Sequence, residues 1–436
     1  MALTGRTALI AALGALVVGP ILPGLHGVLA VEVPLLLAIL YDLIRAAPVR
    51  KLRFIRSGDT SVRLGEQASV TLLLTNPSGR TLRARLRDAW PPSSWSTGEA
   101  LSTSRHDVAV PPGERQRIRT VLTPTRRGDR HADRVTVRSY GPLGLAARQG
   151  SHSVSWTVRV LPAFTSRRHL PAKTARLREL DGRTSILTRG EGTEFDSLRA
   201  YIPGDDTRSI DWRATARQTT VAVRTWRPER DRRVLLVLDT SRTSAGRVGD
   251  APRLDAAMDA ALLLTALASR AGDHVDLLAY DRHVRASVRG RRAQDVLPAF
   301  VEAMANLEPE LVEADARGLT ATALKMARHR SLVVLFTGLE PAAVEEQLLP
   351  SLPQLTQRHT VLVASVADPL LEKMADARGT VDAVYEAAAA AKTQAERRHA
   401  ADLLRRHGAL VVDATPNDLA PTLADAYLAL KAAGRL

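Results

Sequence analysis

Two long apolar stretches open the chain. Residues 7–22 contain no charged side chain, and residues 27–44 contain only Glu32 and Asp42. Each stretch is close to the roughly 17 residues that a membrane-spanning helix needs as a minimum. The pattern predicts a transmembrane hairpin of two helices over residues 1–48.

The charges that flank these stretches predict an orientation. Arg6 precedes the first stretch, no Lys or Arg lies in the connecting turn at residues 20–26, and a basic cluster follows the second stretch: Arg45, Arg50, Lys51, Arg53 and Arg56. The positive-inside rule places both ends in the cytoplasm. We therefore expect a two-pass protein of the inner membrane whose C-terminal domains are cytoplasmic. A cleaved signal peptide with a small-residue site near Ala30, followed by one anchor, is an alternative, and a soluble chain is another.

Residues 49–163 change to short segments in which apolar and polar positions alternate. Turn signals such as Asn76-Pro77-Ser78-Gly79 separate them. Alternation with a period of two predicts strands with one buried face. The expected strands are 69–75, 82–86, 116–122, 134–139 and 153–161. Several short strands with turns between them favour an all-β sandwich, with Trp90 and Trp95 in its core.

Residues 164–230 show weaker patterning, and the part at 167–189 is polar and rich in arginine. We interpret this region as a linker or a strap over the next domain. Residues 231–436 then alternate between apolar strands and amphipathic helices, which predicts a doubly wound, mostly parallel α/β sheet. The expected strands are 234–239, 274–280, 332–337, 360–366 and 409–412, and the expected helices are 253–270, 294–305, 321–329, 342–355, 382–407 and 416–432.

The candidate chemistry of the α/β domain lies at the end of its first strand. Asp239 follows an unbroken aliphatic run, and Ser241 and Thr243 come two and four residues later. Open α/β sheets bind ligands at the carboxyl ends of their strands. Three oxygen donors on one short loop suit a hard cation such as Mg²⁺ or Mn²⁺. Alternatively, these side chains only satisfy backbone amides at the strand–helix junction.

The spacing D-x-S-x-T resembles the metal-ion-dependent adhesion site of von Willebrand factor type A domains. A longer pattern upstream resembles the signature of the domain of unknown function 58 family. It comprises Glu194, Phe195, Leu198, Arg199, Tyr201, Pro203, Gly204, Asp205, Arg208, Ile210, Asp211, Trp212, Ala216, Arg217, Val223, Arg224, Glu229 and Arg230. Members are bacterial, membrane-anchored proteins with a von Willebrand A-like core. The resemblance therefore implies this core at 231–436 and an all-β domain between it and the membrane.

The resemblance also implies the remaining metal ligands and a partner. A complete site of this kind takes a threonine from a second loop, here Thr320 or Thr322, and an aspartate after a later strand. This chain has Gly338 at that second position, and Glu340 two residues on is the nearest carboxylate in sequence. Proteins of this kind are commonly associated with MoxR-type AAA+ ATPases, so such an ATPase is the expected partner.

The signature residues form a second candidate site. Asp205, Asp206 and Asp211 lie among arginines that include Arg199, Arg208, Arg213 and Arg217. One interpretation is a turn held by Asp–Arg hydrogen bonds with Trp212 buried as a peg. The other is a docking surface for a ligand or a protein, made by Glu194, Arg199, Tyr201, Asp205, Arg208, Asp211, Trp212 and Arg217.

Composition narrows the function classes. The chain has 436 residues, a net charge of +15 and no cysteine, so disulfides and thiolate metal sites are excluded. Its arginines are scattered, and no zinc-finger or RNA-binding pattern is present, so we expect no nucleic-acid partner. No nucleophile elbow, P-loop or H-E-x-x-H motif indicates an enzyme. We predict a membrane-anchored, non-enzymatic protein-binding or scaffold protein involved in envelope assembly. The alternatives are a carboxylate- or metal-dependent hydrolase, and a binder of polyanions or lipid surfaces.

Overall fold

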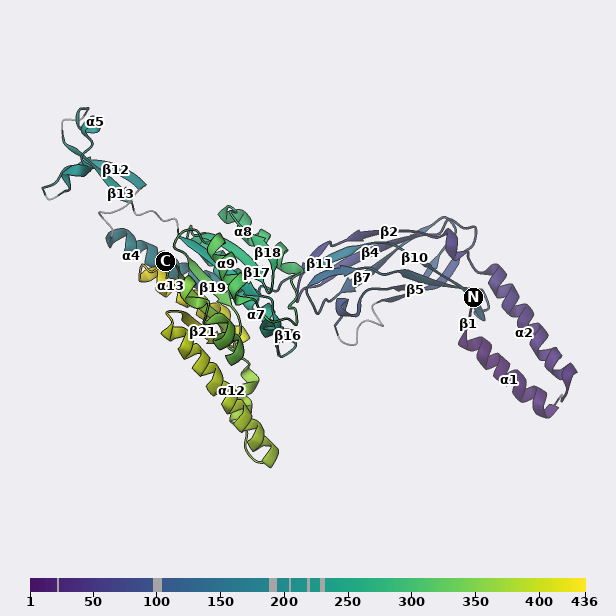
Figure 1. The fold of residues 1–436 in the computed structure, drawn as a ribbon. Coiled ribbons are helices and arrows are strands. Elements are labelled where there is room, and N and C mark those ends of the chain that lie inside the picture. The colour runs from purple at the N-terminus through teal and green to yellow at the C-terminus, as the bar shows by residue number, and fades with distance from the viewer. Residues whose placement is uncertain (22, 97–103, 188–193, 204, 218–219, 228–231) are drawn as a thin grey trace. The chain divides into compact units, whose positions relative to one another are not determined.

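The computed structural model describes the whole chain except residues 22, 97–103, 188–193, 204, 218–219 and 228–231, and it describes the backbone alone at 181–187, 194–197 and 225–227. The chain forms two compact units, Met1–Leu161 and Pro162–Leu436. Figure 1 shows the first unit as two helices joined to a β domain, and the second as an α/β domain with added elements.

Two apolar helices begin the first unit: α1 (Gly5–Ile21) and α2 (Leu25–Arg45). They pack closely, since a Cβ added to Gly14 would lie 2.4 Å from Cγ1 of Val31. The segment Leu25–Lys51, with a mean hydropathy of 2.1, is long and apolar enough to cross a membrane, whereas α1 is shorter. Among the described residues, one helix is therefore a candidate membrane span, and the two-pass topology stays a prediction.

The β domain consists of three sheets, whose strands are β1 (Ala2–Leu3), β2 (Arg53–Gly58), β3 (Ser61–Arg63), β4 (Ala68–Thr75), β5 (Leu82–Asp88), β6 (Arg105–Val110), β7 (Arg115–Leu122), β8 (Gly128–His131), β9 (Val135–Tyr140), β10 (Ala146–His152) and β11 (Thr157–Leu161). The sheet orders are β1-β10-β9-β5-β6, β2-β4-β7 and β3-β11-β8. Leu72 and Leu74 of β4 share one buried cluster with Leu82 and Leu86 of β5, so two of the sheets enclose a common core, as predicted.

A buried ion pair lies inside this domain. The guanidinium of Arg56 donates to both carboxylate oxygens of Asp88, at 2.8 and 3.2 Å. Asp88 also accepts hydrogen bonds from Trp90 and Thr120, each at 3.1 Å. Trp90 and Trp95 are buried, as expected for core aromatics.

The polar region after the β domain is more regular than the predicted linker. It forms a short 3₁₀ helix, Thr165–His169, and then α4 (Leu170–Leu187). Helix α4 packs on α7 (Arg253–Arg270) and α13 (Pro416–Ala432). Lys173 and Arg176 both pair with Asp425, at 2.7 and 3.0 Å. Leu170 and Leu177 of α4 are also buried, so apolar contacts and interhelical ion pairs together hold this polar segment. A two-stranded sheet follows it, made by β12 (Glu194–Ala200) and β13 (Ala222–Arg227).

The α/β domain contains one six-stranded sheet in the order β18-β17-β14-β19-β20-β21. Its strands are β14 (Arg233–Asp239), β17 (His274–Tyr280), β18 (Val284–Val288), β19 (Leu332–Phe336), β20 (Thr360–Val366) and β21 (Leu410–Ala414). All pairs are parallel except β17 with β18. In chain order the strands run 3-2-1-4-5-6, a doubly wound sheet whose order reverses between β14 and β19.

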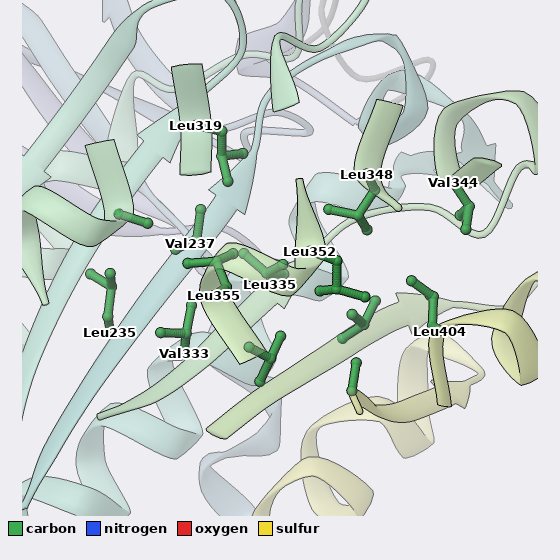
Figure 2. Close-up of a cluster of buried hydrophobic side chains, with 14 of the residues drawn as sticks. Leu235, Val237, Leu319, Val333, Leu335, Val344, Leu348, Leu352, Leu355 and Leu404 are labelled. Atoms are coloured by element: carbon green, nitrogen blue, oxygen red, sulfur yellow. The ribbon is translucent and has the colours of Figure 1, made fainter. Parts of the chain in front are cut away.

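Helices cover both faces of this sheet. Alternate side chains of β14 and β19, such as Leu235 and Val333, share a buried cluster with α9 (Ala316–Met326), α10 (Leu352–Thr356) and α12 (Val381–Arg406) (Figure 2). Leu236 and Leu238 are also fully buried and point to the opposite face, where α7 packs on β14. Burial on both faces explains the unbroken aliphatic run before Asp239.

Several expected boundaries were wrong. The helix predicted at 321–329 begins at Ala316, because the Asp315 side chain accepts a 3.0 Å hydrogen bond from the Gly318 amide and caps it there. The helix predicted at 342–355 is interrupted, and forms a π-helix at Ala343–Leu348 and then α10. Strand β18 and helices α8 (Ala293–Ala305) and α11 (Pro369–Ala375) complete the domain. We had predicted α8 but not the other two.

Candidate functional site

Asp239 lies at the carboxyl end of β14, next to the point where the strand order reverses. Its Oδ1 accepts a hydrogen bond from the Ser241 amide at 2.8 Å, and its Oδ2 accepts from the Thr243 hydroxyl at 2.6 Å. The Thr337 hydroxyl, directly after β19, donates to the same Oδ2 at 2.7 Å. Asp239 and Ser241 are almost completely buried. We had not predicted Thr337, although it ends the neighbouring strand.

Asp239, the carboxylate of the predicted cation site, makes contacts within the protein. Both oxygens of the one carboxylate already accept hydrogen bonds, and hard divalent ions are held largely by carboxylate charge. Thr320, predicted as a ligand, lies within α9, one turn after its start, and its buried hydroxyl makes no hydrogen bond in the described part of the chain. Among the described residues, no group of three or more His, Asp or Glu side chains could hold a metal.

Gly338 leaves room that Glu340 fills. A Cβ built on Gly338 would lie 1.8 Å from Oε2 of Glu340, so the longer side chain turns back into the space a side chain at 338 would occupy. The other oxygen of Glu340 pairs with the guanidinium of Arg253 at the start of α7. The missing carboxylate is thus replaced by one that already has a positive partner within the protein.

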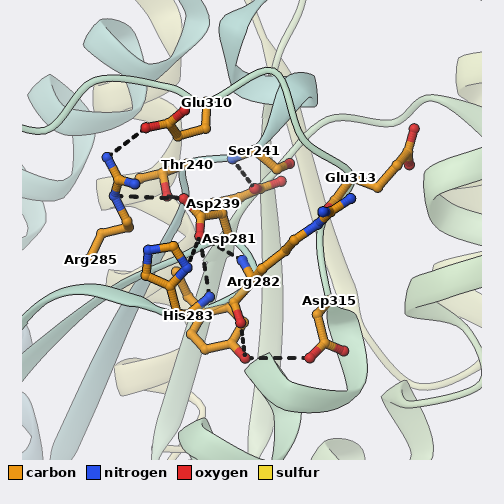
Figure 3. Close-up of polar contacts among 11 residues, drawn as sticks. Asp239, Thr240, Ser241, Asp281, Arg282, His283, Arg285, Glu310, Glu313 and Asp315 are labelled. Atoms are coloured by element: carbon orange, nitrogen blue, oxygen red, sulfur yellow. Dashed lines mark hydrogen bonds and ion pairs between the residues drawn. The ribbon is translucent and has the colours of Figure 1, made fainter.

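A second buried carboxylate, Asp281, was not predicted. It follows β17 as Asp239 follows β14, and it accepts hydrogen bonds from the Thr240 hydroxyl at 3.1 Å and from the Arg282 amide at 2.6 Å (Figure 3). Burial alone would raise the pKa of Asp281, but the amides of Arg282 and His283 and the Thr240 hydroxyl lower it overall. The sequence could have pointed to Asp281, because it directly follows the strand that ends at Tyr280, just as Asp239 stands at the end of β14.

A small cavity of about 40 Å³ opens beside Asp239. That space holds roughly three water molecules. Its wall is mostly apolar and comes from β14, β19, α9 and the π-helix, including Val237, Leu319, Leu335, Val344 and Leu348.

The cavity rim is polar and exposed. Arg242 pairs with Glu313 at 2.7 Å, and both side chains are more than half exposed. Gln347, on the π-helix, donates to the other oxygen of Glu313 at 2.8 Å. An apolar depression with a charged, exposed rim is the usual composition of a small protein-docking site.

The signature residues form a separate cluster on the β12–β13 sheet. Arg199 binds both oxygens of Asp205, at 2.7 and 2.6 Å, and Asp205 also accepts from the Ile202 amide. The Arg199 guanidinium is the main cause of the lowered pKa of Asp205. The Tyr201 amide bonds the Val221 carbonyl at 2.8 Å and continues the pairing of the two strands. The predicted Asp–Arg network is present at this pair.

Asp211 is the second junction of this cluster. It caps the short helix α5 (Trp212–Thr215) by accepting from the amides of Arg213 and Ala214, at 3.0 and 2.9 Å, and it binds Arg224 at 2.8 Å. The Ala214 amide, and then Arg224, lower the pKa of Asp211.

Trp212 is 68% exposed, so its prediction as a buried peg was wrong. It is the first residue of the four-residue helix α5, none of whose residues is buried. Within the described part of the chain, Arg208 and Arg217 make no side-chain hydrogen bond or ion pair, so only some of the predicted arginines belong to the network. The side chain of Glu194 lies outside the described residues.

Comparisons with known proteins find one matching family and several relatives. Residues 197–407 match the sequence model of a family described as "Protein of unknown function DUF58". The chain is also 29% identical over 188 residues to uncharacterized proteins of Mycobacterium bovis and Mycobacterium tuberculosis. That alignment covers 42% of this chain and 57% of each relative, so less than two thirds of each relative is matched.

Solved structures resemble only a part of the chain. The CARDB domain of a Pyrococcus furiosus protein, in complex with di-metal ions, is 15% identical with a TM-score of 0.19, and the match covers 25% of this chain and 87% of that one. A beta-glucosidase of Listeria innocua is 14% identical with a TM-score of 0.15, covering 24% of this chain and 16% of that one. These scores support no argument about function.

Proposed function

Because the chain belongs, through residues 197–407, to the DUF58 family of unknown function, we propose that it is a membrane-anchored, non-enzymatic protein-binding protein. Its α/β head would be von Willebrand A-like and would bind a partner at the rim around Asp239. The parallel sheet with one antiparallel edge strand supports the comparison with that fold. The apolar segment Leu25–Lys51 supports the anchor.

The cavity beside Asp239 carries the docking proposal. It lies at the carboxyl edge of the sheet, where doubly wound domains bind ligands, and an exposed polar rim surrounds an apolar wall. The Asp239 hydrogen bonds hold the ends of β14 and β19 in place and so give the site a rigid floor. A partner side chain that enters an apolar pocket surrounded by polar contacts is the usual anchor of a protein interface.

We also propose that this docking needs no divalent cation. Glu340 and Arg253 supply opposite charges at the place where a cation site would need a free carboxylate. The guanidinium already neutralises Glu340, so a divalent ion would have to displace it. Binding would then rest on shape and hydrogen bonds, with no metal bridge to a partner carboxylate.

A MoxR-type AAA+ ATPase is the proposed partner, as the family resemblance implies. The head would act from the cytoplasmic side of the inner membrane, in the assembly of envelope complexes. The non-enzymatic part of the proposal is supported by the state of the buried acids: Asp239 and Asp281 both accept several internal hydrogen bonds, which fix them as structural groups.

The absence of cysteine from the chain makes a direct test available. Gln347→Cys places one thiol at the cavity rim, and Ala271→Cys places one at a residue of similar partial exposure directly after α7, at the opposite edge of the sheet. The full-length variants, carrying a photoactivatable cross-linker, are mixed with a MoxR-type ATPase in detergent. We expect cross-links from residue 347 and at least fivefold fewer from residue 271. Equal yields, or none from residue 347, would contradict docking at this rim.

A further inference from the structure

We propose that the junction between α2 and the β domain binds the headgroups of anionic phospholipids. The binding surface, called here the basic collar, consists of Arg6, Arg45, Arg50, Lys51 and Arg53, all of which are exposed. The proposal concerns the first unit alone and is independent of the Asp239 rim. The proposal rests on the proposed membrane location of α2.

Hydrogen bonds to Asp42 bring Arg6 and Arg45 of the collar to the same turn of the β domain. Asp42, in the last turn of α2, is completely buried and accepts from the amides of Leu143, Leu145 and Ala146, at 2.8, 2.6 and 3.0 Å. The turn of the β domain at residues 141–146 is thus held against the helix. A Cβ built on Gly144 would lie 3.0 Å from the Arg6 guanidinium, so Arg6 lies beside the same turn. The start of α1 and the end of α2 therefore meet there.

The end of α2 is further fixed by arginines of the β domain. Arg148 donates to the Leu43 carbonyl at 2.8 Å, and Arg80 donates to the Ile44 carbonyl. These bonds satisfy carbonyls that the last turn of a helix leaves free. The β domain is consequently joined to its helix by a rigid, hydrogen-bonded contact, and the collar keeps a defined position relative to the helix axis.

The collar carries positive charge that the protein does not neutralise. Within the described residues, no carboxylate forms an ion pair with any of its five cations. Asp42, the acid nearest in sequence to Arg45 and Arg50, is buried with its oxygens turned toward backbone amides. Other arginines of the domain are paired, as Arg85 is with Asp107.

Exposed apolar side chains lie next to these cations. Leu3, Ile44 and Leu143 are 64%, 51% and 47% exposed. Leu143 is held beside α2 because its backbone amide donates a hydrogen bond to the Asp42 carboxylate. Exposed apolar side chains beside exposed cations match the boundary between hydrocarbon and headgroups. A nucleic acid or an acidic peptide would match the charge but would leave the apolar side chains and α2 exposed to water, so a lipid surface fits best.

The experiment uses the full-length protein in a neutral detergent. It is titrated with dioctanoyl phosphatidylglycerol, with dioctanoyl phosphatidylcholine and with inorganic phosphate, and binding is measured by calorimetry. The collar variant carries Arg45→Gln, Arg50→Gln and Lys51→Gln. The control variant carries Arg87→Gln, Arg105→Gln and Arg126→Gln, which remove the same charge from exposed positions of the β domain. Arg87 is near the end of β5 remote from Arg80, roughly 20 Å along the strand.

We expect phosphatidylglycerol to bind the wild type and the control variant with similar affinity, and the collar variant at least tenfold more weakly. Phosphatidylcholine and inorganic phosphate should bind at least tenfold more weakly than phosphatidylglycerol. The proposal would be overturned if phosphatidylglycerol bound the collar variant as tightly as the wild type, or if phosphatidylcholine bound the wild type as tightly as phosphatidylglycerol. If inorganic phosphate bound the wild type as tightly as phosphatidylglycerol, the ligand would be free phosphate and not a lipid headgroup.

A salt titration of the wild type provides a test that needs no folded variant. Exposed charges separated from their partners by water are screened as ionic strength rises. The affinity for phosphatidylglycerol should therefore fall, on the order of several-fold, when the NaCl concentration rises from about 0.05 to about 0.5 M. An affinity that does not change with salt would contradict a headgroup contact made by the collar.

Discussion

The hydroxyl of Thr337 donates a 2.7 Å hydrogen bond to Oδ2 of Asp239, and this bond ties the ends of β19 and β14 at the point where the strand order reverses. Parallel strands on the two sides of such a point are continued by helices on opposite faces of the sheet. The bond therefore closes the floor of the cavity that we propose as the docking site.

We predict that Thr337→Val lowers the stability of the protein. Valine keeps the shape of threonine but leaves one lone pair of a buried carboxylate without its donor, which costs about 1.5–3 kcal/mol for a hydrogen bond to a charged group. For a domain of this size, each kcal/mol corresponds to a melting temperature lower by roughly 2–4 °C. Thr337→Ser, which keeps the hydroxyl, is the control and should melt within about 2 °C of the wild type. Equal melting of the two variants would show that the bond contributes nothing.

The second prediction concerns cation binding at the same place. Gly338→Asp alone should displace the Glu340 side chain, because its Cβ would collide with Oε2 of Glu340. The double variant Gly338→Asp with Glu340→Ala removes that collision and supplies a second carboxylate beside Asp239. We expect the double variant to bind Mn²⁺ in a calorimetric titration, and the wild type to show no stoichiometric binding.

The control for this titration is Asp239→Ala in both backgrounds. Loss of Mn²⁺ binding from the double variant would place the ion at Asp239. Stoichiometric Mn²⁺ binding to the wild type that disappears in Asp239→Ala would contradict a cation-independent site. It would instead support the metal site that the D-x-S-x-T spacing suggests.

The pattern of apolar residues predicted most strands of the α/β sheet. An unbroken aliphatic run predicted the strand that ends at Asp239 closely, because burial on both faces leaves no polar position between Val234 and Leu238. Strand β18 at Val284–Val288 was missed, since an exposed edge strand carries arginine between its apolar residues. Local patterning thus predicted the sheet well, except at its edge.

The candidate site was harder to predict, because its contacts join residues far apart in the chain. Asp239 and its loop were predicted, but Thr337 lies 98 positions away and donates to the same oxygen. The turn of Glu340 into the space at Gly338 depends on Arg253, 87 positions earlier. A residue pattern shows which side chains are present near a strand end. It does not show which ones have already been neutralised by a distant partner.

The third prediction concerns Asp281 and pH. Its pKa is lowered in the folded protein, so the native state holds the charged form more strongly than the unfolded chain does. This contribution is present above the unfolded carboxyl pKa of about 3.9, and it is lost as pH falls below that value toward the folded pKa. Asp281→Asn should therefore be less stable than the wild type at pH 7, by about 1–3 kcal/mol.

The difference in melting temperature between wild type and Asp281→Asn should stay nearly constant from pH 7 to about 4, and it should shrink as pH falls below about 3.9, where the unfolded carboxyl becomes protonated. Differential scanning calorimetry at several pH values measures this difference. Asp276→Asn, which changes a less buried acid on β17, serves as the control. A difference that does not shrink between a pH of about 4 and about 3 would mean that the charge of Asp281 does not contribute to stability.

The fourth prediction tests the rigid junction at Asp42. Two nitroxide labels, at Leu29→Cys on α2 and Arg117→Cys on β7, report the distance between the helix and the β domain, and the chain has no cysteine of its own. We expect one narrow distance distribution by pulsed electron paramagnetic resonance. Asp42→Ala removes the acceptor of three backbone amides and should broaden the distribution.

The control for this measurement is Asp107→Ala, which removes an exposed carboxylate from the same domain and should leave the distribution narrow. A narrow distribution in Asp42→Ala would mean that Arg80 and Arg148 hold the helix end without it. A broad distribution in the wild type would contradict the rigid junction itself, and with it the fixed position of the basic collar.

The last prediction distinguishes the two roles of neighbouring signature residues. Trp212 is 68% exposed, so Trp212→Ala should change stability by less than about 0.5 kcal/mol. Asp211 instead accepts from two amides of α5 and from Arg224. Asp211→Ala should therefore increase hydrogen exchange at the Ala214 amide at least tenfold, because that amide loses its acceptor. If Trp212→Ala also weakens cross-linking of the ATPase, the exposed ring belongs to a docking surface. If Trp212→Ala instead destabilises the protein as strongly as a core substitution does, the ring is buried in solution and the exposed position is wrong.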